Sequence, residues 1–267
     1  MEMKFEHLSF GKRLVSMLSV DFRRMFTMPL FYIMTGISVV IPILVLVMTT
    51  MMAGTTTVDP NTGIETTVEA FESVWQAIGS VSGESVGMEM SLTGMCNINL
   101  IYFLAAVLVC IFVADDFRSG YAKNLFTVRP KKTDYVVSKT VTGFVGGGSM
   151  ILGFFVGAML GGAISGLPFD MGAVHSGNII MCLVAKLLLI AVFVPVYLLM
   201  GVVAKQKLWF SILLSLGVGI LFFHIVPMLT PLNSGIINVL MCLAGGILFS
   251  LGMGTVSNQV LNKTSLV

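Results

Sequence analysis

Few residues in this sequence are of the types and spacings that catalytic chemistry requires. Gly11 and Lys12 come nearest to a phosphate-binding loop, but the earlier glycine and the preceding strand of that motif are missing. Ser215 and His224 are nine residues apart in one apolar run, which is about 13 Å along a helix and too far for a hydrogen bond. The sequence contains no HExxH motif. It therefore argues against an enzyme, and any ATP must be hydrolysed by a separate subunit.

The four cysteines do not indicate a metal or cofactor site. They fall in or beside apolar runs, without paired spacing and without histidine neighbours. We interpret them as small apolar packing residues. They are Cys96, Cys110, Cys182 and Cys242. We therefore expect neither a metal nor a cofactor in this chain.

The most informative passage is residues 115–139, DDFRSGYAKNLFTVRPKKTDYVVSK, a charged segment between two apolar runs. It holds six of the fifteen Lys and Arg residues, which predicts a position in water on the cytoplasmic side of a membrane. Within it, Phe117, Tyr121 and Leu125 recur every four residues, and an acidic pair precedes them. The pattern predicts a short amphipathic helix that ends before Pro130. Such a helix either rests on lipid headgroups or contacts a partner.

The same passage resembles the cytoplasmic loop between the second and third spans of type-2 ABC transporter permeases. After an acidic residue, the shared positions are Gly120, Asn124, Leu125, Pro130, a basic pair, Tyr135 and Lys139. One departure is an Asp-Asp pair where a glutamate is more usual. In that family the loop carries the coupling helix, which contacts the ATPase subunit. The coupling residues implied by the resemblance are Asp116, Phe117, Arg118, Gly120, Tyr121, Asn124 and Leu125.

The resemblance also implies the partners and the role of the chain. It implies two copies of a cytosolic ABC ATPase, which bind ATP and Mg, and a second permease protomer, identical or related. It further implies a bacterial plasma membrane protein that exports an antimicrobial peptide, a drug or another amphipathic cargo. A stand-alone secondary carrier or membrane binding protein is the alternative, although no Asp or Glu lies inside the predicted spans.

The composition is that of an integral membrane protein. Hydrophobic residues make up 56% of the 267 residues and charged residues only 10%, against roughly 25% charged in globular domains. All basic residues but one fall in the predicted cytoplasmic loops and tails, so no basic face is left for nucleic acid.

The apolar runs predict an all-α fold with six spans, each long enough to cross a bilayer. The predicted spans are 30–52, 95–114, 140–166, 178–204, 208–229 and 236–256. Fourteen of the fifteen Lys and Arg then lie on one side, one lies inside a span and none lies on the other side. This distribution predicts that both termini are cytoplasmic.

Two segments flank the first span. Residues 1–28 predict an amphipathic connecting helix that lies flat on the cytoplasmic face, where it either flanks the ATPase or anchors the first span of the transmembrane domain, 29–267. Residues 53–95 form an acidic outer loop without Lys or Arg, which either attracts cations or only complements the basic interior. Within this loop one helical face is predicted, made of Val68, Phe71, Trp75 and Ile78.

Three further features fall inside the spans. Gly153, Gly157 and Gly161 are four residues apart and predict a close helix contact, with a partner either in this chain or in a second protomer. Lys186 is the single charge inside a span, and either snorkels outward or faces a cavity and an anionic group. With His224, it is the candidate for the substrate pathway.

Overall fold

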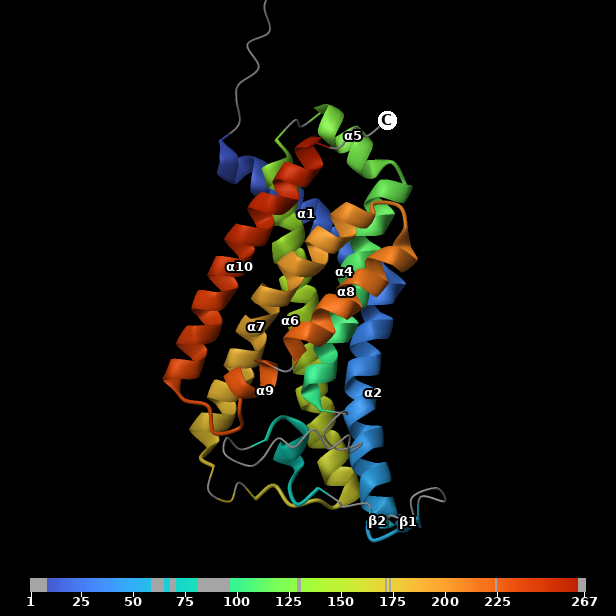
Figure 1. Cartoon of the computed structure of the whole chain (residues 1–267), viewed down its shortest axis with the longest axis vertical. Coiled ribbons are helices and arrows are strands. Elements are labelled where there is room, and N and C mark those ends of the chain that lie inside the picture. Colours follow the sequence, from blue (N-terminus) through green and yellow to red (C-terminus); the bar gives the residue numbers. More distant parts are fainter. Residues whose placement is uncertain are drawn as a thin grey trace, which may run out of the picture.

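The computed structural model describes residues 9–58, 65–67, 71–80, 97–128, 131–170, 172, 174–223 and 225–263. Long helices run side by side along most of its length (Figure 1). The helices are α1 (Phe10–Thr27), α2 (Pro29–Met52), α4 (Ile101–Arg118), α5 (Tyr121–Val128), α6 (Lys132–Ser165), α7 (Ser176–Ala204), α8 (Leu208–Phe223), α9 (Ile225–Leu229) and α10 (Ile236–Lys263). Two 3₁₀ turns, η1 (Val74–Ala77) and η2 (Ile98–Leu100), and two short strands complete the described elements.

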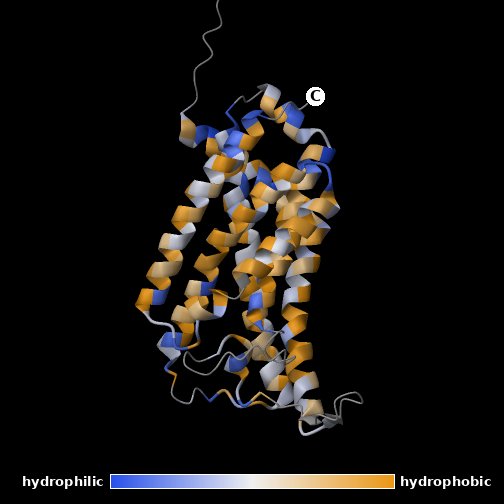
Figure 2. Ribbon diagram, in the orientation of Figure 1, coloured by the Kyte–Doolittle hydropathy of each residue, from blue (hydrophilic) through white to orange (hydrophobic). Residues whose placement is uncertain are grey.

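Five of these helices are long and apolar enough to cross a membrane: α2, η2 with α4, α6, α7 and α10. Figure 2 shows hydrophobic residues along most of their length and hydrophilic ones gathered mainly at the two ends of the bundle. The most apolar windows of α10 and α2 are only 11% and 22% buried within the chain, so these helices flank the bundle. The multi-pass membrane protein predicted from composition is confirmed at this level.

The predicted span 208–229 is described in two parts, α8 up to Phe223 and α9 from Ile225, and α9 contains Pro227. α8 is shorter than the five helices named above. His224, which separates the two parts in the sequence, lies outside the described residues.

Two other boundaries differ from the prediction because polar residues continue the helices. α4 ends at Arg118 rather than Ala114, and α6 begins at Lys132 rather than Thr140. The predicted loop 115–139 therefore consists of the end of α4, α5 and the start of α6, with little loop between them. Asp116, Asp134 and Lys139 are tolerated there because each pairs with a charge on another helix, and Arg118 and Lys123 are exposed.

The three spaced glycines of α6 lie against α2 of the same chain. A Cβ atom added at Gly157 would lie 2.2 Å from the carbonyl oxygen of Val39, and one at Gly161 would lie 2.8 Å from the Cα of Ile43. Only glycine permits this approach of the two backbones. The partner that the sequence left open is therefore α2.

At the end of the bundle opposite α5, η1 packs beneath the loop that follows α6. Trp75 Nε1 donates to the carbonyl of Phe169 at 3.2 Å, and Phe71 and Ile78 are buried beside it. The amphipathic helix predicted here is a single 3₁₀ turn, and Val68 lies outside the described residues. Strands β1 (Thr56–Val58) and β2 (Glu65–Thr67) pair antiparallel after α2, which the sequence did not predict.

Candidate functional site: the junction of α1, α4, α5 and α6

Gly120 separates α4 from α5. Its φ of +74° is a left-handed conformation that glycine adopts at low cost, and it ends α4 after Arg118. The short helix therefore begins at Tyr121, and the acidic pair does not cap it. Asp115 and Asp116 lie instead in the last turns of α4. Figure 1 shows α5 at one end of the bundle, with α1 and the end of α10; we call this the α5 end.

The predicted apolar stripe of Phe117, Tyr121 and Leu125 is not one face of one helix. The break at Gly120 leaves Phe117 on α4, where it is buried, while Tyr121 and Leu125 on α5 are half-buried. The buried face of α5 consists of Ala122 and Phe126. Its exposed face is polar and comprises Lys123, Asn124 and Thr127, with Arg118 exposed at the end of α4. A partner that approaches α5 from solvent therefore meets polar side chains.

Behind α5 lies a buried ion-pair cluster, which we define as Asp21, Arg24, Asp116 and Lys139. Lys139 Nζ lies 2.9 Å from Asp21 Oδ1 and 2.7 Å from Asp116 Oδ2. Arg24 Nη1 lies 2.5 Å from Asp116 Oδ1. Two positive and two negative groups thus balance one another, and the cluster joins α1, α4 and α6.

Two hydroxyl groups complete the hydrogen bonds of the carboxylates. Ser138 Oγ donates to Asp21 Oδ2 at 2.6 Å, and Tyr135 Oη donates to Asp116 Oδ2 at 2.9 Å. The Lys139 ammonium also lies 3.7 Å from the ring centroid of Phe112, a cation–π contact. A buried charge is tolerated when it is paired and hydrogen-bonded, and these contacts meet that condition.

Arg24 connects the cluster to α5. Its guanidinium carbon lies 4.3 Å from the ring centroid of Tyr121. Burial alone lowers the pKa of Arg24, but the charge of Asp116 and the hydrogen bond to it raise the pKa above its ordinary value. Burial, followed by the charges of Asp21 and Asp116, raises the pKa of Tyr121. Near neutral pH Arg24 is charged and Tyr121 is neutral, which preserves the contact.

A second ion pair holds α1 against the first turn of α6. Arg13 Nε lies 2.8 Å from Asp134 Oδ2, and this hydrogen bond raises the pKa of Arg13. The predicted amphipathic helix over residues 1–28 is described only from Phe10, where α1 begins. Its buried face is not purely apolar, because Asp21 lies between Met17 and Met25 on that face.

Sequence reasoning missed the role of Asp21 and of its partner Ser138. An indication was present, since Asp21 follows Met17 and precedes Met25 by four residues each and so interrupts a helical apolar stripe. An acidic residue at such a position requires a cation from another helix. Only the fold identifies that cation as Lys139, 118 residues later.

Lys186, in α7, does not snorkel to the surface of the described residues. Its side chain is fully buried, and Nζ donates to Asn99 Oδ1 at 2.8 Å and to Thr230 Oγ1 at 2.9 Å. Both acceptors are neutral. His224, the other candidate for the substrate pathway, lies outside the described residues.

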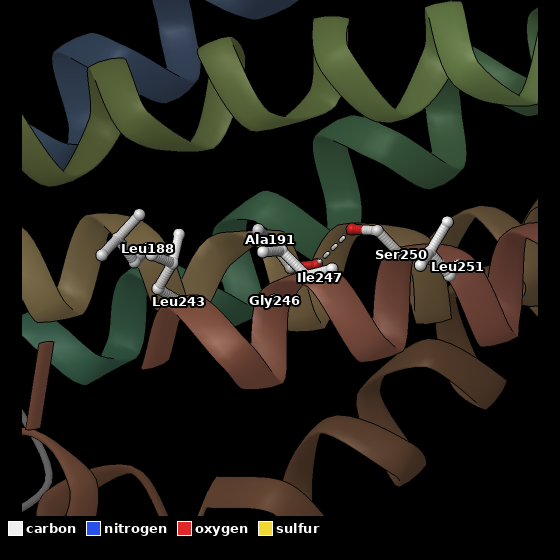
Figure 3. Close-up of a pocket in the computed structure, with 7 residues that line it drawn as sticks. All are labelled: Leu188, Ala191, Leu243, Gly246, Ile247, Ser250 and Leu251. Carbon is white, nitrogen blue, oxygen red and sulfur yellow. Dashed lines mark hydrogen bonds between the residues drawn. The ribbon is translucent and has the colours of Figure 1, made fainter. Parts of the chain in front are cut away.

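A groove of about 270 Å³ lies between α7 and α10 and contains none of the predicted site residues. Figure 3 shows Ser250 of α10 donating a hydrogen bond to the carbonyl of Ala191, at 3.1 Å. The lining is otherwise apolar: Leu188, Ala191, Leu243, Gly246, Ile247 and Leu251.

Three of the four cysteines, Cys110, Cys182 and Cys242, are buried away from this groove, and Cys96 lies outside the described residues. The described residues contain no group of side chains that could hold a metal ion.

Comparison with known proteins identifies the family. The sequence model of a family described as ABC-2 family transporter protein matches residues 23–223. The chain belongs to the ABC-2 transporter family. The match includes Arg24, Asp116 and Lys139 of the ion-pair cluster, and Asp21 lies just before it. No curated protein and no solved structure matches the chain.

Family membership settles the general role. An ABC-2 transporter protein of this kind is the membrane-embedded permease subunit of an ABC transporter, and ABC ATPase subunits are its partners. This agrees with the resemblance seen in residues 115–139 and with the five apolar helices.

Proposed function

We propose that this ABC-2 permease receives the motion of a separate, cytosolic ATPase through the exposed face of α5. The observation that carries the proposal is the two-sided environment of this helix. Lys123, Asn124 and Thr127 face solvent, whereas the other side of α5 meets Arg24 through the ring of Tyr121. A force applied to α5 therefore reaches the buried ion-pair cluster and, through it, α1, α4 and α6.

The resemblance assigned Asp116, Phe117, Arg118, Gly120, Tyr121, Asn124 and Leu125 to coupling, and the structure divides them by position. Arg118 and Asn124 are exposed and fit direct contact with the ATPase. Asp116 and Phe117 are buried and fit a positioning role. Gly120 provides the turn, and the half-buried Tyr121 and Leu125 hold α5 on the bundle.

In the assembled transporter, two ATPase copies bind ATP and Mg, and a second permease protomer, identical or related, completes the pathway. ATP-driven closure of the ATPase subunits displaces α5 on each protomer, and the attached helices rock between inward-open and outward-open arrangements. The α5 end then lies in the cytoplasm of a bacterial cell. The positive-inside tendency supports this orientation, because the described Lys and Arg residues of α1, α5 and the start of α6 lie at this end.

The cargo class rests on kinship alone. We propose export of an amphipathic molecule, such as an antimicrobial peptide or a drug, because the resembled permeases move such cargo. A stand-alone carrier remains the competing function, and it predicts transport that does not respond to ATP.

The test reverses one exposed charge on α5. The chain is purified from native membranes, and its bound proteins are searched for an ATP-binding cassette. Lys123→Glu is expected to lower recovery of that ATPase roughly tenfold, which corresponds to about 1.4 kcal/mol, because reversing a charge at an interface weakens binding of the partner. Lys207→Glu is the matched control, since Lys207 is also exposed and lies in the α7–α8 turn.

Equal recovery of the ATPase with both variants would show that α5 is not the contact. Vesicles containing only this chain that transport at full rate without ATP would instead support the stand-alone carrier.

A further inference from the structure

Lys186 differs from every other buried charge among the described residues in having no charged partner. The other buried charges are Asp21, Asp116, Asp134 and Lys139, and each forms an ion pair at the α5 end. No carboxylate of the described residues lies within ion-pair distance of Lys186. An uncompensated ammonium inside a membrane span costs at least about 2.5 kcal/mol on insertion scales.

The surroundings of Lys186 are polar but neutral. Thr230 accepts from Nζ and itself donates to the carbonyl of Val226, at 2.8 Å. Cys182, one turn before Lys186 on α7, donates to the carbonyl of Thr230 at 3.5 Å. Tyr102 donates to the carbonyl of Lys186 itself, at 3.0 Å. The helices thus hold the lysine in place without neutralising it.

The ammonium group also retains a free donor. It has three N–H bonds, and the described residues provide two acceptors, Asn99 and Thr230. An anionic oxygen accepts a hydrogen bond about twice as strong as that to a neutral amide or hydroxyl oxygen. An anion would therefore compete effectively for Lys186.

We propose that Lys186 is the centre of a binding site for a carboxylate or phosphate group carried by an amphipathic molecule. The inference rests on the proposed transport function, in which that molecule is the cargo. It narrows the cargo class to anionic amphiphiles. In this structure Asn99 and Thr230 accept hydrogen bonds from the ammonium that the anion would otherwise accept.

The position of the two neutral acceptors provides the route of access. Asn99 lies in η2, at the start of the span that continues as α4, and Thr230 directly follows α9, so both acceptors lie at helix ends. Lys186 lies ten residues after Ser176, the first residue of α7, which is about 15 Å along the axis. Under this proposal, the anion reaches Nζ when one of the two acceptors moves away from it.

The test measures binding to the purified full chain in nanodiscs of zwitterionic phosphatidylcholine, without the ATPase. The probes are dodecyl phosphate and dodecyltrimethylammonium, which share one alkyl chain and differ in charge. We expect the wild-type chain to bind the phosphate probe at least about tenfold more tightly than the cationic probe. Equal affinities would overturn the proposal, and this comparison requires no variant.

Three variants test whether the preference for dodecyl phosphate depends on Lys186. Lys186→Met is expected to abolish it and Lys186→Arg to retain it. Lys205→Met, which removes an exposed lysine, is expected to leave it unchanged. A preference that persists in Lys186→Met would overturn the assignment to this residue. Because the assay contains no ATPase, failure here would leave the proposed role of α5 untouched.

Further arms distinguish the source of the anion. Inorganic phosphate that competes with dodecyl phosphate would identify a site for a free anion. A second arm replaces the phosphatidylcholine of the nanodiscs by phosphatidylglycerol. If this change abolishes binding of dodecyl phosphate to the wild-type chain and leaves Lys186→Met unaffected, the occupant is a lipid headgroup. If neither inorganic phosphate nor phosphatidylglycerol competes with dodecyl phosphate, the result supports an amphipathic cargo.

Discussion

Lys139 and Lys186 are both buried, but among the described residues only Lys139 has carboxylate partners. Lys139 is 2% exposed, contacts two carboxylates and lies over an aromatic ring, whereas Lys186 is 0% exposed and contacts one amide and one hydroxyl oxygen. The charges of the ion-pair cluster thus balance one another, which suits it to transmit force as a unit. The described residues around Lys186 supply no anion, so the lysine is suited to receive one.

The largest effect on stability is expected when Lys139 is removed from the ion-pair cluster. Lys139→Met leaves Asp21 and Asp116 buried, with only Arg24 to compensate, and should lower the free energy of unfolding by about 3–5 kcal/mol. Lys186→Met removes a charge without leaving a partner charge behind, so it should be neutral or stabilising. Chemical denaturation of both variants in the same detergent makes the comparison.

Equal destabilisation by the two substitutions would contradict the distinction between the two lysines. As an internal control, Asp21→Asn added to Lys139→Met should recover part of the lost stability, since it removes one of the stranded charges.

An intermediate effect is expected where α2 and α6 touch. Gly157→Ala places a methyl group 2.2 Å from a backbone oxygen of α2 and should destabilise by about 1–3 kcal/mol. Gly217→Ala is the control, because a Cβ there has nothing within 4 Å among the described residues. Thermal unfolding of the two variants is the measurement. Similar midpoints would mean that the helices separate easily.

The smallest effect concerns the contact between the cluster and α5. The pKa of Tyr121 is raised in the folded chain, so its contribution to stability is complete below pH 10 and is lost as the pH rises above 10. Tyr121→Phe keeps the ring but not the phenol, and should make the unfolding midpoint less sensitive to alkali. Midpoints at pH 8 and pH 11 for both proteins provide the measurement. An unchanged pH dependence would indicate that Tyr121 is not in contact with the charged cluster.

The short helix at the α5 end illustrates where sequence reasoning succeeded and where it failed. An eight-residue helix does follow the second span, as the spacing of Tyr121 and Leu125 indicated. Its start was misplaced because a conformational break at Gly120 is not visible in a four-residue periodicity. The buried face was misassigned for the same reason, since a break between Phe117 and Tyr121 removes the helical relation between them.

The sequence by itself determined that the chain crosses a membrane, roughly where its long helices lie, and which segment resembles a coupling helix. These follow from hydropathy and spacing, which are local and additive along the chain. Only the tertiary structure decided which charges are compensated. Lys139 meets Asp21 across 118 positions, while Lys186 meets Asn99 and Thr230 from two other segments. Electrostatic energy depends on distance in space, and in this fold distance in space bears little relation to distance along the sequence.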